Sequence, residues 1–244
     1  MTKIVIIIPS RLNAKRLQNK PLKLINDKEM ILHVHDVAVK ANIGDVFVAT
    51  PDIEILNIVR KNKGKAIITK TEHPTGTDRV FEVFEKELKS QPDFIINLQG
   101  DMPNLNPFVL QNLVNHMKKG KCDMSTLASS LKNEKEKKNP NVVKVITSNK
   151  INENEFSNAL DFFRIPENTP HNNIYHHVGI YAFTNKALIR YVSLKRSKLE
   201  MDRNLEQLRA LENKMKIDVG YINFCPLSVD TEEDLIEIRK LMKN

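Results

Sequence analysis

The chain has 244 residues, 41% of them hydrophobic, so it can bury a substantial core and a protein disordered throughout is excluded. Its formal net charge of +8 is compatible with binding of nucleic acid, with binding of small anionic substrates and with a general enrichment in lysine. Because the lysines are scattered along the chain, the charge alone does not decide between these interpretations. Cys122 and Cys225 lie far apart and form no CxxC pair, so their spacing offers neither a disulfide framework nor a zinc site. No apolar run is long enough to span a membrane. We therefore expect a cytoplasmic protein.

The first half of the chain alternates between strand and helix patterns. Apolar, β-branched runs predict strands at residues 3–9, 45–50, 65–69 and 93–98. Apolar residues at helical spacing predict helices at residues 30–41, 53–62, 78–88 and 107–117. Strands that alternate with helices in this way indicate βαβ units and a parallel sheet. Ligand-binding loops are therefore expected at the carboxyl ends of these strands.

The alternation loosens after Cys122. Further strands are predicted at residues 141–146, 159–164, 175–183 and 216–221, and further helices at 201–212 and 231–242. The polar segments 149–155 and 166–173 are predicted to be loops. Because the chain has no internal repeat and no Gly/Ser-rich linker, we predict one domain spanning residues 1–244.

A basic loop follows the first strand, from Pro9 to Pro21. It carries Arg11, Lys15, Arg16 and Lys20 at the carboxyl end of a strand that is predicted to be central. Parallel-sheet proteins bind anions at this position, and a triphosphate suits several cations in one loop. The loop has neither GxxxxGK[ST] nor GxGxxG, so a P-loop and a dinucleotide fold are not supported. The alternative interpretation is a solvated basic loop.

Two aspartates stand at positions that suit a magnesium ion. Asp101 follows the fourth strand directly after Gly100, which lets the backbone approach a ligand closely. Asp230 precedes the last helix, where it can equally be the N-cap, with Glu233 completing a capping box. The two carboxylates make a metal site only if the fold brings them together.

The segment 72–79 joins the third strand to the third helix. Thr77 or Asp78 can cap that helix, and Gly76 allows a tight turn. In a ligand-binding loop, the backbone groups and Arg79 can read the edge of a base.

Polar residues also gather late in the chain. Alternation along a strand places His177 and Tyr181 on one face, although a histidine in a strand is more often a hydrogen-bonded partner than a catalyst. Glu206 and Gln207 lie on the helix predicted at 201–212, where most such side chains face solvent.

Taken together, these segments resemble the 3-deoxy-manno-octulosonate cytidylyltransferases, also called CMP-Kdo synthetases, over nearly the whole chain. Each matching motif is weak alone, but six in order form a specific signal. They are Ile8–Arg11 with Arg16–Leu22, Pro74–Arg79, Asn97–Pro103, His177–Tyr181, Leu205–Arg209 and Val229–Leu235.

The resemblance implies an α/β fold of three layers, with a mostly parallel, Rossmann-like sheet of the nucleotide-diphospho-sugar transferase type and a β-rich insertion. It implies transfer of CMP from CTP to the acidic eight-carbon sugar Kdo, with release of pyrophosphate, for lipopolysaccharide synthesis. Mg²⁺ is the implied cofactor, a homodimer the implied assembly, and neither nucleic acid nor a membrane is an implied partner. The resemblance also divides the chain by role. The nucleotide would be bound by residues of about 1–120, and the sugar and the dimer contacts would belong to residues of about 121–225. The C-terminal segment 226–244 would pack back against the nucleotide-binding part.

The resemblance also implies a role for individual residues. Asp101 and Asp230 would ligate the metal and, with Lys20 and Arg11, form the catalytic set. The nucleotide would contact Pro9, Ser10, Arg11, Arg16, Lys20, Thr50, Gly76, Thr77, Arg79 and Gln99. The sugar would contact Gln99, Arg164, His177, Tyr181, Glu206 and Gln207.

The chain departs from the family pattern at five positions, which are Pro51, Thr75, Met102, Phe163 and Arg203. Phe163 and Arg203 can alter the sugar pocket, so amino-Kdo or sialic acid is a second possible substrate. Three further hypotheses stay open: a sugar nucleotidyltransferase that uses another nucleotide, an inactive homologue that acts as a scaffold, and a nucleic-acid-binding module.

Overall fold

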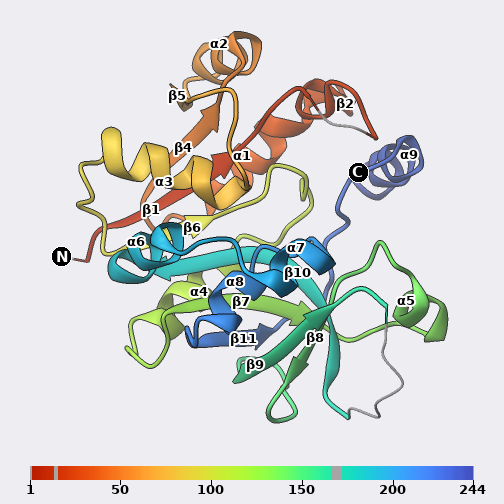
Figure 1. Ribbon diagram of the computed structural model, residues 1–244. Helices are drawn as coiled ribbons and strands as arrows, with labels where there is room; N and C mark the ends of the chain where they lie inside the picture. The colour runs from red at the N-terminus through yellow and green to blue at the C-terminus, as the bar shows by residue number, and fades with distance from the viewer. Residues whose placement is uncertain (1, 14–15, 166–171, 244) are drawn as a thin grey trace. The chain divides into compact units, whose positions relative to one another are not determined.

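The computed structural model describes residues 2–13, 16–165 and 172–243. The chain forms two compact units (Figure 1). The first unit contains Met1–Gln111 together with Pro226–Asn244, and the second contains Asn112–Cys225. Lys15 and residues 166–171, most of a predicted loop, lie outside the described residues.

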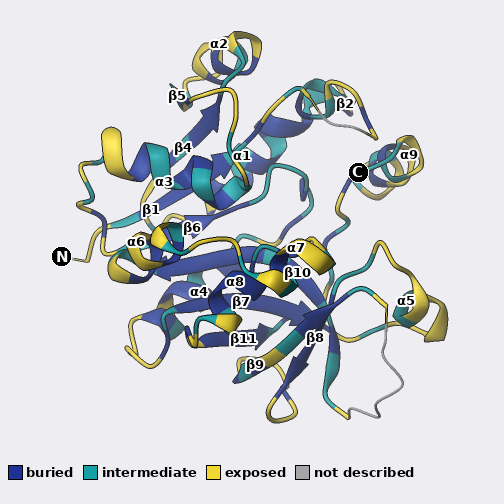
Figure 2. Cartoon of the chain, viewed as in Figure 1, coloured by how far each residue is buried: buried dark blue, intermediate teal, exposed yellow. Residues whose placement is uncertain are grey.

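The first unit is built on a parallel sheet, as predicted. Its strands lie in the order β5 (Lys65–Ile68), β4 (Asp45–Thr50), β1 (Ile4–Pro9) and β6 (Phe94–Asn97). β1 pairs in parallel with both β4 and β6, so the basic loop does leave from an interior strand. The interior residues of β1 are buried on both faces (Figure 2), which explains its unbroken β-branched run.

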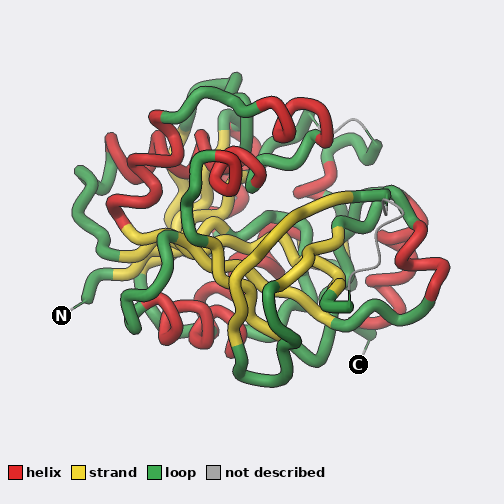
Figure 3. Tube along the Cα trace, turned by 60° about the horizontal axis from the view of Figure 1, so that its bottom comes forward, coloured by secondary structure: helices red, strands yellow, loops and turns green. Residues whose placement is uncertain are grey.

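Helices alternate with these strands along the chain and pack against the sheet. Figure 3 draws the helices of the molecule in red and its strands in yellow. α3 contacts β1, β4 and β6, whereas α1 and α2 contact β4. The elements are η1 (Lys20–Leu22), the hairpin β2 (Leu24–Ile25) and β3 (Lys28–Glu29), α1 (Met30–Lys40), α2 (Ile53–Lys61), α3 (Gly76–Lys86) and α9 (Glu232–Leu241). α4 (Phe108–Met117) begins in the first unit and ends in the second. Within the described residues, no helix is long and apolar enough to cross a bilayer.

The carboxyl-terminal segment belongs to the first unit because it shares that unit's core. Val229, Leu235 and Ile238 are buried in one apolar cluster with Leu17 and Ile25 and with the start of α1. Burial of several large apolar side chains stabilises this return by roughly 2 kcal/mol for each. The cluster therefore fixes the residues that flank Asp230.

The final helix α9 is not capped by Asp230. Thr231 is the N-cap, and its hydroxyl accepts the N–H of Asp234 at 3.2 Å. Asp234 accepts the N–H of Thr231 at 2.9 Å, which completes a capping box. The prediction that Asp230 and Glu233 form this box is wrong, because the helix begins one residue later. The Asp230 side chain is therefore directed to other partners.

The cap of α3 also differs from prediction. Thr75 is the N-cap and accepts the N–H of Asp78 at 3.3 Å, so the interpretation of Thr77 or Asp78 as the cap is wrong. The helix begins two residues earlier than predicted, at Gly76, because the Thr75 hydroxyl is already placed to satisfy its first turn.

The second unit contains a mixed sheet that closes on itself. Its described strands are β7 (Met124–Ser129), β8 (Lys144–Thr147), β9 (Phe156–Phe163), β10 (Ile174–Thr184) and β11 (Ile217–Tyr221). They lie in the order β10-β7-β11-β9-β8, and β8 pairs again with β10. The pair β7–β11 is parallel, whereas β7–β10, β8–β10, β9–β11 and β8–β9 are antiparallel.

The predicted helix at 201–212 is two helices. The helices of this unit are α5 (Glu134–Lys138), α6 (Asn185–Ser193), α7 (Lys198–Arg203) and α8 (Leu208–Glu212). Asn204 ends α7 in the left-handed conformation, with φ of 52°. A buried ion pair joins the two pieces, since Arg209 donates to Glu200 through Nε at 2.9 Å and Nη2 at 2.7 Å. The break leaves Glu206 and Gln207 in a turn rather than on a continuous helix.

Candidate active site

A cavity of about 330 Å³ lies in the first unit at the carboxyl ends of β1 and β6. This is the position predicted for the ligand loops. Its walls combine the basic loop, the segment before α3 and the residues that follow β6. It is lined by Pro9, Ser10, Arg11, Asn13, Lys20, Pro21, His73, Pro74, Thr75, Gly76, Arg79, Gln99, Gly100 and Asp101.

Lys20 joins the two aspartates that were predicted to converge. Its Nζ lies 3.0 Å from Asp101 Oδ2 and 3.0 Å from Asp230 Oδ1, so these oxygens are separated by at most twice that distance. Burial lowers the pKa of Lys20, but the two carboxylates outweigh burial and raise it. Lys20 is therefore a fixed positive charge at the edge of the cavity.

A main-chain hydrogen bond explains why residues so distant in sequence meet. The Val229 N–H donates to the Asp101 carbonyl at 2.9 Å, which sets the two loops side by side. Arg16 donates to Asp230 Oδ2 at 2.9 Å, whereas Lys20 binds the other oxygen, Oδ1. Burial raises the pKa of Asp230, but Lys20 and Arg16 outweigh this effect and hold it below its usual value. Asp230 is thus ionised at neutral pH.

The two carboxylates suit a divalent cation. Asp101 Oδ1 is buried and has no hydrogen-bond partner in the described part of the chain, although its other oxygen receives Lys20. A buried carboxylate oxygen without a donor is costly unless a ligand occupies it. Carboxylate oxygens are the ligands that Mg²⁺ prefers, usually one or two from the protein. The residues present therefore fit this ion.

The basic loop is anchored by Asp52, which sequence reasoning missed. Asp52 Oδ2 accepts the N–H of Leu12 at 2.7 Å, and the Ser10 N–H donates to the Ala49 carbonyl at 2.9 Å. Thr50, predicted to contact nucleotide, does not line the cavity, and its hydroxyl accepts the N–H of Asp52 at 3.1 Å. Asp52 directly follows Pro51, one of the positions at which the chain departs from the family pattern.

Arg79 lines the cavity, but its guanidinium mainly binds groups of the protein itself. Its guanidinium is buried and donates to the Thr69 hydroxyl, to the Lys70 carbonyl at 2.8 Å and to the Thr71 carbonyl at 3.1 Å. Burial, followed by the nearby charge of Arg11, lowers the pKa of Arg79. These bonds fix the loop that leads into α3.

A relay of amides shapes another wall of the cavity. Gln99 Nε2 donates to Asn97 Oδ1 at 3.0 Å, and Asn97 Nδ2 donates to the Thr77 hydroxyl at 3.0 Å. Thr77 itself is buried and does not line the cavity. Gly76 adjoins this wall, since a Cβ placed on it would lie 3.5 Å from Gln99 Nε2, an ordinary van der Waals contact.

His73 also lines the cavity and was not predicted as a site residue. Its Nε2 lies 2.7 Å from Glu82 Oε2 on α3, which fixes the ring. Glu82 also receives the Lys70 N–H at 3.0 Å and Lys86 Nζ at 2.9 Å. Burial raises the pKa of Glu82, but these donors outweigh it and lower the pKa to about 2.

Glu82→Gln is expected to destabilise the protein at pH 7, and the effect should shrink as the pH falls from 4.5 toward 2. The folded pKa of about 2 is below the ordinary value of 4.5, so the carboxylate stabilises the fold above pH 4.5 and loses this contribution as the pH falls toward 2. Urea unfolding between pH 3 and 7 measures the difference between the variant and the wild type. Glu85→Gln, an exposed change on the same helix, is the control. A difference that stays constant over this range contradicts the assignment.

The second unit brings three predicted sugar-binding residues together. Tyr181 donates its hydroxyl to Gln207 Oε1 at 3.0 Å, and the His177 and Tyr181 rings lie 5.7 Å apart. His177 Nε2 lies 2.9 Å from the Thr126 hydroxyl, and burial lowers the pKa of His177 to about 3, so it is neutral. Gln207 Nε2 is buried and lacks a hydrogen-bond partner within residues 2–13, 16–165 and 172–243.

The other two sugar-binding residues predicted in the second unit are placed differently, and the sixth, Gln99, lines the cavity of the first unit. Arg164 donates to the carbonyls of Pro140 and Asn141 at 3.2 and 3.3 Å, so its guanidinium braces the loop before β8. Glu206 lies in the turn before α8, and its carbonyl accepts the Tyr191 hydroxyl at 3.0 Å. Burial raises the pKa of Tyr181 and the charge of Glu206 adds to this shift.

Comparison with known proteins agrees with this geometry. The sequence model of the cytidylyltransferase family matches residues 5–217. A 3-deoxy-manno-octulosonate cytidylyltransferase from Paramagnetospirillum magneticum is 40% identical over 243 residues, covering 98% of this chain and 97% of that protein. This chain belongs to the cytidylyltransferase family. The protein of the same name from Brucella ovis is 40% identical over 238 residues, covering 97% of this chain and 94% of that protein.

A solved structure of a protein from the same family has a closely similar fold. A CMP:2-keto-3-deoxy-manno-octonic acid synthetase complexed with CTP is 35% identical, with a TM-score of 0.89 over 99% of this chain and 98% of that one. A 4-diphosphocytidyl-2C-methyl-D-erythritol synthase from Anaerococcus prevotii is 14% identical, with a TM-score of 0.66 over 100% and 99% of the two chains, which shows the fold alone. The predicted resemblance and fold class are confirmed.

Three of the residues at which the cytidylyltransferase departs from the family pattern, Met102, Phe163 and Arg203, are accommodated within the fold. Arg203 Nη1 binds both carboxylate oxygens of Asp161, at 2.7 and 2.8 Å, and also the Phe162 carbonyl at 2.9 Å. Phe163 and Met102 are buried. The positive charge of Arg203 is therefore offset inside the second unit.

Proposed function

We propose that this chain transfers CMP from CTP to 3-deoxy-manno-octulosonate and releases pyrophosphate. The observation that carries the proposal is the Lys20 ammonium bound by Asp101 and Asp230 at the edge of the first unit's cavity. The names of relatives at 40% identity over nearly the full chain support the choice of sugar and nucleotide.

The proposed reaction is a direct in-line displacement. The anomeric hydroxyl oxygen of the sugar acid attacks the α-phosphorus of CTP, and the bond from that phosphorus to the bridging oxygen of the β-phosphate breaks. The hydroxyl proton passes to solvent and pyrophosphate leaves. Transfers of this kind need positioning and charge neutralisation rather than a protein nucleophile.

The cations of the basic loop have distinct proposed roles. Arg11 lines the cavity and forms no hydrogen bond or ion pair with a described residue, so its planar donors remain for phosphate oxygens. Lys20, held in place by two carboxylates, would offset charge that develops on the departing pyrophosphate. Arg16 lies outside the cavity lining and would act through Asp230.

Asp101 and Asp230 are the proposed magnesium ligands. When bound, Mg²⁺ would neutralise phosphate charge and act as a Lewis acid. The buried, partnerless oxygen of Asp101 is the feature of this chain that favours such an ion.

The remaining proposals concern the sugar and the assembly. Gln207 Nε2, a buried donor without a described partner, would bind a sugar oxygen together with Tyr181. We further propose a homodimer formed through the second unit, where Leu160, Ile165 and Phe224 are exposed apolar side chains. Sedimentation equilibrium measures that assembly. Because CTP is a cytoplasmic metabolite, the proposed enzyme acts there.

Pyrophosphate release from CTP with a panel of sugar acids tests the function. Kdo is expected to give the highest kcat/KM, and replacement of CTP by UTP, dTTP or ATP should abolish turnover. Preference for amino-Kdo or sialic acid would overturn the sugar assignment while keeping the reaction. Absence of pyrophosphate release with every pair would overturn the reaction itself.

A further inference from the structure

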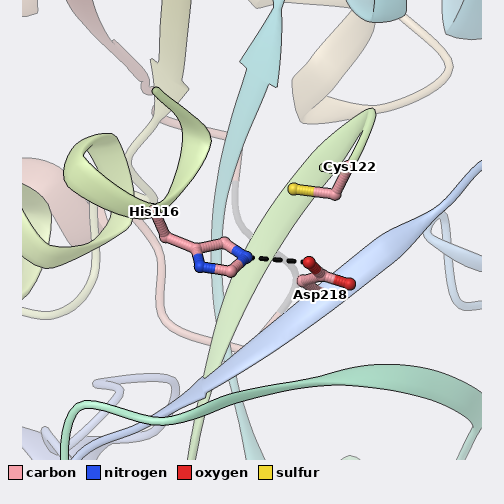
Figure 4. Close-up of side chains that lie close together, drawn as sticks. All are labelled: His116, Cys122 and Asp218. Atoms are coloured by element: carbon pink, nitrogen blue, oxygen red, sulfur yellow. Dashed lines mark hydrogen bonds and ion pairs between the residues drawn. The ribbon is translucent and has the colours of Figure 1, made fainter. Parts of the chain in front are cut away.

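Three side chains of types that can bind a metal ion lie close together in the second unit (Figure 4). His116 comes from the last turn of α4, Cys122 from the turn before β7 and Asp218 from β11. One ligand atom of each lies within 4.8 Å of the other two, and His116 Nε2 is 2.7 Å from Asp218 Oδ2. The cluster contains an imidazole nitrogen, a sulfur and a carboxylate oxygen that point toward one another.

The surrounding structure holds these side chains in place. The His116 ring stacks on Phe156, with centroids 3.8 Å apart and planes inclined by 3°. Asp123, next to Cys122, accepts the Lys216 N–H at 2.8 Å, and the Asp123 N–H donates to the Lys216 carbonyl at 3.0 Å. The position of the turn relative to β11 is thus fixed by the main chain. A preorganised set of ligands is the condition for tight metal binding.

A further polar group lies beside the cluster. Asp218 is in register with Ser125 on the parallel neighbour β7, so the two side chains leave the same face of the sheet. Ser125 Oγ is buried and lacks a hydrogen-bond partner among the residues that the structure describes. An open coordination position filled by water is typical of sites with three protein ligands, and such a water needs polar partners.

We propose that His116, Cys122 and Asp218 form a zinc site. Zn²⁺ takes nitrogen, sulfur and oxygen ligands together and accepts three protein ligands with water in the fourth position. Magnesium does not suit this set, because it requires oxygen ligands. The side chains are mostly buried, with Cys122 9% and Asp218 6% exposed, so a bound ion would be shielded.

Metal binding would change the protonation of the cluster. Without a cation, the Cys122 thiol donates to Met117 Sδ at 3.5 Å. Coordination by sulfur requires the thiolate, so the thiol proton passes to solvent when zinc binds. The bound ion would tie the end of α4 to β7 and β11, which gives the site a structural role.

This site is separate from the proposed nucleotide cavity, whose lining contains none of the three residues. The spacing of the cysteines does not predict this site, because the other two ligands are not cysteines. His116 belongs to a helix, and Asp218 belongs to a strand 96 positions beyond Cys122 in the sequence. A motif search sees only ligands that are close in sequence.

Cobalt titration of the metal-free, full-length chain tests the proposal. A thiolate bound to Co²⁺ gives an intense near-ultraviolet charge-transfer band, which carboxylate ligands in the first unit cannot produce. We expect this band to saturate at one Co²⁺ per chain and to disappear when Zn²⁺ displaces the cobalt. Metal analysis after gel filtration should then find one zinc per chain.

Variants assign the ligands. Cys122→Ser should abolish the band, whereas Cys225→Ser, the matched control, should keep it. His116→Gln should weaken zinc binding by at least about 100-fold and provides a second check if the Cys122 variant does not fold. A wild-type protein without the band, or a band that is lost in Cys225→Ser and kept in Cys122→Ser, overturns the site.

Discussion

Asp101→Asn is expected to lower kcat by about 100- to 1,000-fold at saturating CTP, the range for loss of one strong electrostatic contact in a transition state. The amide matches the carboxylate in size but carries no charge. The change removes the negative charge shared by the buried oxygen that has no described donor and by the oxygen that binds Lys20. Pyrophosphate release at several magnesium concentrations measures the effect, and excess magnesium should not restore the wild-type rate.

The fold should survive this substitution, because Asp230 and the Val229 main-chain bond remain. Circular dichroism and thermal unfolding establish that the variant is folded. Asp45→Asn is the matched control, since Asp45 is an exposed aspartate at the amino end of β4, away from the cavity lining. Full turnover by Asp101→Asn at ordinary magnesium would remove Asp101 from the catalytic set.

The parallel sheet of the first unit could be predicted because burial on both faces leaves a continuous apolar run in the sequence. β7 was not predicted, because its sequence has no continuous apolar run. Its sequence from Met124 to Ser129 includes Ser125, Thr126 and Ser129, and all three are buried by neighbouring strands. Tertiary contacts rather than local pattern make this segment a strand.

The break between α7 and α8 has a similar origin. The apolar spacing of residues 201–212 is helical, but Asn204 adopts a left-handed conformation and the buried pair of Glu200 with Arg209 joins the two pieces. An ion pair nine residues apart does not follow the spacing of one regular helix, so periodicity could not reveal it.

The candidate site was predictable in its residue types and only partly in its geometry. Arg11, Lys20 and Asp101 follow the carboxyl ends of strands in the sequence, and they line one cavity in the fold. The meeting of Asp101 with Asp230 depends on the main-chain bond from Val229 and on the apolar cluster that buries Val229. These contacts join residues far apart in the sequence, so no local pattern encodes them. The direction in which a side chain points could not be predicted from the sequence either. Thr50 supports Asp52 instead of facing the cavity. The division of roles between nucleotide and sugar residues stays a prediction, as does the single domain.

Lys20→Met should separate catalysis from metal binding. Methionine keeps the length and apolar stem of lysine but removes the ammonium that lies 3.0 Å from each aspartate. We expect kcat to fall by about 100-fold, because no cation then offsets charge on the departing pyrophosphate. In the enzyme without nucleotide, magnesium should bind roughly tenfold more tightly, since the ammonium no longer competes for the two carboxylates.

Isothermal titration with Mg²⁺ and single-turnover kinetics measure the two effects on the same preparation. Lys23→Met is the matched control, because Lys23 lies in the same segment, 3.9 Å from Glu232, and does not line the cavity. If Lys20→Met binds magnesium less tightly than the wild type, the ammonium organises the carboxylates rather than competing for them. If turnover is unchanged, Lys20 serves only to join the two loops, and charge neutralisation has to come from Arg11, the other cation of the basic loop that lines the cavity among the described residues.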